Sequence, residues 1–73
     1  MNMHSLTITS NHVTEHTAQD LILRAVLNNA ARQPCRFGLF SVSFDETESG
    51  EHVATLRAGT KVAAVAVVDA FDF

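Results

Sequence analysis

Thr17-Ala-Gln-Asp-Leu-Ile-Leu-Arg-Ala-Val-Leu-Asn-Asn-Ala-Ala-Arg32 is the segment that decides the fold class, because it has the clearest helical periodicity in the chain. Its larger apolar side chains fall on one stripe at the helical repeat, and its polar side chains recur on the opposite side. Thr14 and Thr17 are both suitable N-caps, since a threonine oxygen can accept a hydrogen bond from the first helical turn. Pro34 then prevents continuation of the helix. The segment predicts one amphipathic helix.

Four segments outside this helix predict strands. Leu6–Ser10 alternates apolar and small polar residues, which is typical of a strand with one buried face. Arg36–Phe44 and His52–Arg57 follow the helix and are separated by an acidic loop. Val62–Phe71 begins with an alanine-containing run that a helix could also accommodate, but its valines favour a strand.

The order of these elements predicts an α+β fold over a single domain, residues 1–73. We expect two layers, with one helix packed on a small antiparallel sheet in the order β-α-β-β-β. A chain of this length buries only about 60% of its unfolded surface, so its core must be small. The side chains expected between helix and sheet are Ile22, Val26, Phe40, Val42, Phe44 and Val65.

One helix covers one face of a sheet, so the other face needs a separate explanation. Strand alternation assigns Phe37 and Leu39 to the uncovered face. Leu21 falls on the charged side of the helix, where a monomer has no use for a large apolar side chain. These residues predict self-association, most simply as a homodimer. In the alternative, the N-terminal residues or the last strand fold back over that face.

Composition excludes several classes of protein. The chain is 47% hydrophobic and 18% charged, which is too apolar for a disordered tail. Its net charge is −3 with five basic residues, so we expect no direct binding to nucleic acid. No apolar run approaches the length of a membrane span, and the N-terminus lacks the pattern of a secretory signal. A cytoplasmic location without membrane attachment is therefore the expectation.

The acidic loop is the main candidate for a contact with a partner. It places four carboxylates within seven residues: Asp45, Glu46, Glu48 and Glu51. Such a cluster can steer a basic protein partner, and it can equally be a solvated hairpin loop. A calcium site is not expected, because Thr47 and Ser49 stand where carboxylate ligands are needed.

The other chemistry-bearing residues lack the companions that catalysis or metal binding requires. His12 and His16 have the spacing of two ligands on a helix, but they straddle the predicted helix start without a third ligand. Cys35 has arginines nearby in sequence but no adjacent histidine. Neither Ser41 nor Ser43 lies in a nucleophile elbow. We therefore expect no enzyme activity, no catalytic residue, no metal and no cofactor.

Two functions fit these properties. The first is a small non-catalytic protein-binding domain, such as an inhibitor or antagonist of a larger macromolecular machine. Its size and acidity are similar to those of virus-encoded inhibitors of bacterial defence complexes such as CRISPR, which is an analogy without a shared motif. The alternative is a self-assembling carrier of a small ligand. The strand–helix–three-strand order resembles that of dodecins, small flavin-binding proteins whose subunits cover each other's sheets, although this chain has no Trp or Tyr to stack on a flavin.

Overall fold

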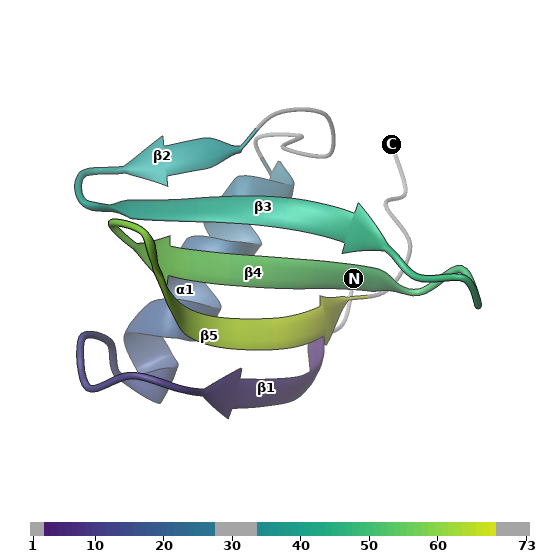
Figure 1. Cartoon of the computed structure of the whole chain (residues 1–73), viewed down its shortest axis with the longest axis horizontal. Coiled ribbons are helices and arrows are strands. Elements are labelled where there is room, and N and C mark those ends of the chain that lie inside the picture. The colour runs from purple at the N-terminus through teal and green to yellow at the C-terminus, as the bar shows by residue number, and fades with distance from the viewer. Residues whose placement is uncertain (1–2, 28–33, 69–73) are drawn as a thin grey trace.

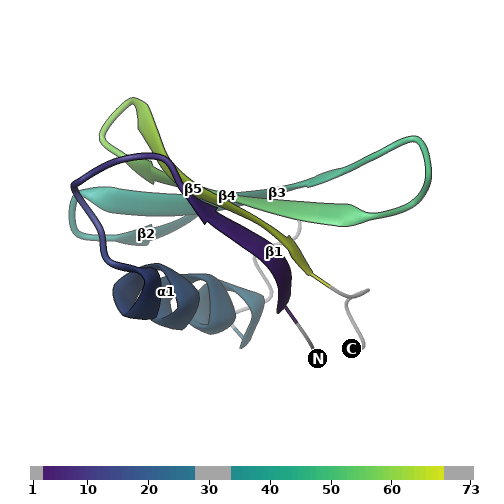
Figure 2. The ribbon, with the colours of Figure 1, turned by 90° about the horizontal axis from the view of Figure 1, so that it is seen from below.

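The computed structural model describes residues 3–27 and 34–68, and these form one helix and five strands. The elements are β1 (Met3–Ile8), α1 (Glu15–Leu27), β2 (Cys35–Phe37), β3 (Phe40–Glu46), β4 (His52–Ala58) and β5 (Lys61–Val68). The strands make one sheet in the order β1-β5-β4-β3-β2, in which every neighbouring pair is antiparallel (Figure 1). The helix lies against one face of this sheet (Figure 2), so the predicted two-layer α+β fold is confirmed.

The predicted strand Arg36–Phe44 is wrong, because the chain reverses in its middle. Phe37 pairs with Phe40 across a two-residue turn, and β2 and β3 form a hairpin. Gly38 has φ of 64° in this turn, and a glycine with positive φ at the first turn position is the mark of a type II′ hairpin. The element order is therefore β-α-β-β-β-β, with one strand more than predicted.

A second hairpin has the same design. The turn at Gly59 joins β4 to β5, and Gly59 also has φ of 64°. Its N–H donates a hydrogen bond to the carbonyl of Leu39 at 2.9 Å. The two turns therefore support each other at one end of the sheet.

The helix begins two residues earlier than predicted. Thr14 precedes it, and the Thr17 N–H donates to Thr14 Oγ1 at 3.2 Å, which makes Thr14 the N-cap. Asp20 and Arg24 form an exposed ion pair at 3.1 Å, one helical turn apart. The predicted C-terminal part of the helix, beyond Leu27, lies outside the described residues.

Replacing Thr14 by alanine should lower the free energy of unfolding by about 1 kcal/mol, because an N–H of the first helical turn then loses its acceptor. Thr14→Ser is the matched control, since serine keeps the oxygen and should unfold within a few tenths of a kcal/mol of the parent. Urea unfolding followed by far-ultraviolet circular dichroism measures both. Equal stability of the two variants would contradict the assignment of this cap.

The core between helix and sheet is built mainly from small side chains. Its four largest fully buried members are Ile22, Val42, Leu56 and Val68. The remaining space is filled by alanines that have no exposed surface: Ala18, Ala25, Ala54, Ala63, Ala64 and Ala66. Small side chains on both layers let the helix approach the sheet closely.

The core prediction is confirmed in part. Ile22, Val26 and Val42 are buried, and Phe40 and Phe44 are half-buried against the same cluster. Val65 was placed between helix and sheet, and this is wrong. It pairs with Thr55 on β4 and is half-buried on the opposite face. Of the residues described, no helix has the length and apolar character needed to cross a membrane.

Candidate functional site

Among the described elements, only α1 packs on the sheet, and it covers one face; we call the opposite face the open face (Figure 2). Because cross-strand partners share a face, the pairing arranges its residues in three rows. The basic row contains Arg36, Ser41, Arg57 and Val62. The middle row contains Ser43, Thr55 and Val65. The acidic row contains Asp45, Val53 and Val67.

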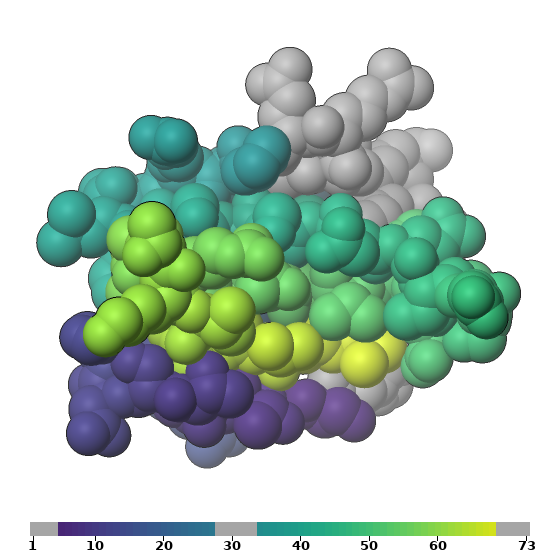
Figure 3. All heavy atoms as spheres, viewed as in Figure 1, coloured from purple at the N-terminus to yellow at the C-terminus, as the bar shows by residue number. Residues whose placement is uncertain are grey.

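The apolar part of the open face lies along β5. Val62, Val65 and Val67 are the β5 valines that lie on the open face, and we call them the valine column. Val62 is 41% exposed, and the other two are half-buried. On β3 the equivalent positions are Ser41 and Ser43, as expected for a sheet face in contact with water. Figure 3 views this face in space-filling form, with β3, β4 and β5 across its centre. The valine column is therefore an uncovered apolar strip bordered by polar strands.

Arg57 is held in place within the open face. Its Nη1 donates a hydrogen bond to Ser43 Oγ at 2.8 Å in a partly buried setting. Thr55 lies in the middle row and is only 9% exposed. Arg36 is exposed at the edge strand, in the same row as Arg57. The face thus presents one hydrogen-bonded guanidinium and one exposed guanidinium.

The two ends of the described sheet carry opposite charges. The end with the two type II′ turns contains Arg36, Arg57 and Lys61. The other end contains the four carboxylates of the predicted contact: Asp45, Glu46, Glu48 and Glu51. Along the strand direction the surface therefore changes from basic to acidic.

The acidic end is a defined hairpin, and all four of its carboxylate residues are exposed. The predicted loop begins too early, because Asp45 and Glu46 belong to β3. The turn itself is closed by two backbone hydrogen bonds, from the Thr47 N–H to the Glu51 carbonyl at 2.8 Å and from the Gly50 N–H to the Thr47 carbonyl at 2.9 Å. Glu51 also receives a hydrogen bond from the Ser49 hydroxyl at 3.3 Å. We call residues 45–51 the acidic hairpin; it extends past the ends of the neighbouring strands (Figure 1).

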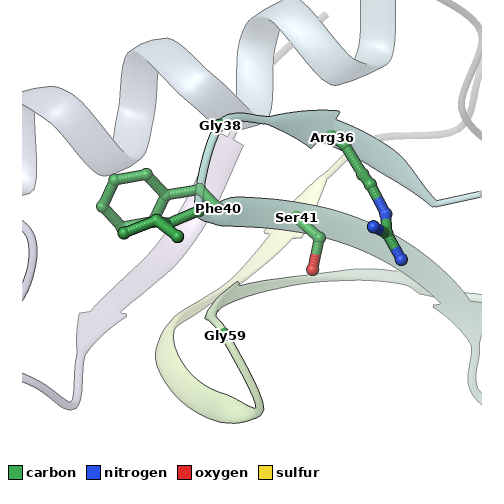
Figure 4. Close-up of a pocket in the computed structure, with 6 residues that line it drawn as sticks. Arg36, Gly38, Phe40, Ser41 and Gly59 are labelled. Carbon is green, nitrogen blue, oxygen red and sulfur yellow. The ribbon is translucent and has the colours of Figure 1, made fainter.

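A pocket of about 310 Å³ lies at the basic end, beside the two turns. It is lined by Arg36, Gly38, Leu39, Phe40, Ser41 and Gly59. Figure 4 shows Arg36 and Ser41 pointing to one side of the hairpin and the ring of Phe40 to the other. This hollow therefore has a cationic and a hydroxyl group on its open-face side.

The three residues predicted for self-association do not lie together on the open face. Phe37 shares the helix side with Phe40 and packs against the core, because the hairpin reverses the alternation on which its assignment depended. Leu39 lies in the turn and is 84% exposed. Leu21 is half-buried and contacts the core, so it is not an isolated apolar residue on a charged surface. The residues that sequence reasoning missed are the valine column and Arg57.

The remaining candidate groups are dispersed in the described part of the chain. His12 and His16 are exposed, and His12 Nδ1 lies 2.9 Å from Ser10 Oγ. Cys35 is half-buried against the core. Within residues 3–27 and 34–68, no group of three or more His, Cys, Asp or Glu side chains is placed to hold a metal ion.

Comparisons with known proteins give no relative to reason from. The chain matches no family model, and neither a curated protein nor a solved structure resembles it at a significant level. The site must therefore be interpreted from its own geometry.

Proposed function

We propose that this chain is a small non-catalytic protein-binding domain whose contact surface is the open face together with the acidic hairpin. The observation that carries the proposal is the valine column, which no described element covers. Apolar surface bordered by polar residues is typical of protein interaction sites. Ser43, which is half-buried in the middle row, gives a partner a polar group near the centre of the contact.

The acidic hairpin adds long-range attraction to this surface. Its four exposed carboxylates lie within seven residues, and like charges concentrated in one segment raise the association rate of an oppositely charged partner. We therefore propose a partner with a basic surface. The role expected from size and charge is inhibition of a larger assembly, and the self-assembling ligand carrier remains the alternative prediction.

Neutralising the acidic hairpin tests the proposed contact. Asp45→Asn combined with Glu46→Gln, Glu48→Gln and Glu51→Gln should leave the circular dichroism spectrum unchanged, because these residues are exposed. When the immobilised parent is incubated with a lysate at low salt, it should retain a basic protein, and added salt should elute that protein. The immobilised variant should retain about tenfold less of the same protein. Asp20→Asn, which removes an exposed acid on the helix, is the matched control and should capture as the parent does. Identical capture by all three chains would contradict the proposal.

A further inference from the structure

We infer that the open face binds a second copy of this chain, with the two sheets packed face to face about a twofold axis that runs across the strands along the middle row. This inference rests on the proposed function, because it assigns a partner to the same surface. It is carried by the charge pattern of the face, by the valine column and by the area available.

The charge pattern is complementary to itself in one orientation. A twofold axis across the strands places the basic end of one copy over the acidic end of the other. Arg36 and Arg57 then approach Asp45 and Glu51 of the second copy, and the symmetry makes this contact twice. An axis along the strands would instead bring like charges together at both ends, which is unfavourable. The preferred orientation is thus set by the sign of the charges.

The same axis brings the valine column onto itself. Val65 lies in the middle row, so it meets its own copy at the axis. Val62 and Val67 lie on either side of Val65 on the same strand. Val62 of one copy therefore meets Val67 of the second copy, and Val67 meets Val62. Sheets that pack face to face keep their strands within about 30° of each other, which preserves these pairings approximately. Each side chain of the valine column therefore has an apolar partner.

The open face is large enough for a weak dimer. The two longest extents of the molecule are 29 and 21 Å, and Figure 1 views the sheet across them. They limit the contact to at most about 600 Å² per copy, or about 1,200 Å² in total, which does not exceed the lower end of the range for stable specific interfaces. The pocket beside Arg36 and Ser41 gives room for side chains of the second copy's acidic hairpin. We expect a dimer that dissociates on dilution and in salt.

Charge reversal tests this arrangement. One variant carries Arg36→Glu and Arg57→Glu, and the other carries Asp45→Arg and Glu51→Arg. The parent should sediment at low salt as a concentration-dependent dimer of its 7.9 kDa chain. Each variant alone should dimerise about tenfold more weakly or worse, because like charges now meet at both contacts. An equimolar mixture should recover the parent's affinity, since reversing both ends restores attraction in the mixed pair.

Three results would overturn the inference: a parent that is monomeric at every concentration, variants that dimerise as the parent does, or a mixture that stays monomeric while both variants are folded. Arg36→Glu with Asp45→Arg as separate single variants repeats the test if loss of the Arg57 hydrogen bond unfolds the first variant. A monomeric parent would leave the proposed function standing, because capture of a basic protein by the acidic hairpin is measured independently. Dimers that form but do not depend on these charges would place the interface elsewhere.

Discussion

Replacing Leu56 by alanine is expected to lower the free energy of unfolding by about 2–5 kcal/mol, which approaches the whole stability of a domain this small. Leu56 has no exposed surface and lies on β4 between Val42 and Ala64, facing the helix. Removing its side chain leaves a cavity at the centre of the sheet, where surrounding strands cannot collapse to fill it. Urea unfolding monitored by circular dichroism suits this chain, because it has no Trp or Tyr for fluorescence.

Leu39→Ala is the matched control for this substitution. Leu39 is 84% exposed in the β2–β3 turn, so the same change in side chain should alter stability by no more than about 0.5 kcal/mol. Leu56→Met, which keeps most of the volume, should cost less than about 1.5 kcal/mol. If Leu56→Ala has the same free energy of unfolding as Leu39→Ala, the assignment of Leu56 to the core is wrong.

Enlarging Ala54 to leucine should destabilise the chain by about 1–3 kcal/mol, because the helix packs too closely for a larger side chain. Ala54 has no exposed surface and pairs with Phe44 on one side and Ala66 on the other. The helix contributes buried alanines to the same interface, including Ala18 and Ala25. The added carbon atoms must therefore move the helix or adopt strained conformations.

The control for overpacking is Ala58→Leu, on the same strand and the same side of the sheet. Ala58 is half-buried at the end of β4, where a longer side chain can reach solvent. It should change the unfolding free energy by less than about 1 kcal/mol. Equal destabilisation by the two substitutions would mean that the layers are not closely packed by small residues.

Local pattern was sufficient for the helix and for the class of fold. Ile22 and Val26 are buried as their helical spacing predicts, and Val42 lies on the face of β3 that alternation assigns to the core. The two-layer arrangement follows because one amphipathic helix must bury its apolar stripe against the sheet. These predictions depend only on the periodicity of apolar side chains, which can be obtained from each segment without knowing how the strands pair.

The β2–β3 hairpin was missed because its alternation looks continuous through the turn. Phe37 and Phe40 are odd and even in sequence, so an unbroken strand places them on opposite faces, whereas the hairpin pairs them on one face. The available signal was Gly38, since a glycine followed by one residue between two short β-forming runs is typical of a type II′ turn. Missing it also assigned Phe37 and Leu39 wrongly to the uncovered face of the sheet.

The composition of the open face could not be obtained from the last strand by itself. Val62–Val68 is apolar on both faces, so its own sequence does not say which valines face the helix. The pairing decides it: Ala64 and Ala66 lie opposite Leu56 and Ala54, which leaves Val65 on the far side. A register irregularity between Leu56 and Arg57 also keeps Val62 on that side. Which side chains of β5 face the helix is therefore decided by its pairing with β4, and the sequence of β5 alone does not determine it.

The most direct test of the central claim is an isotope-filtered nuclear Overhauser experiment on a mixture of valine-methyl-labelled and unlabelled chains, which detects only contacts between copies. If the open face is the contact surface, intermolecular signals should join Val62 to Val67 and Val65 to its own copy. The helix-side valines Val42 and Val68 should give none, because they are buried within one chain. Intermolecular signals confined to residues around Leu21 or Phe37, or no signal at concentrations where the chain sediments as a dimer, would contradict the account.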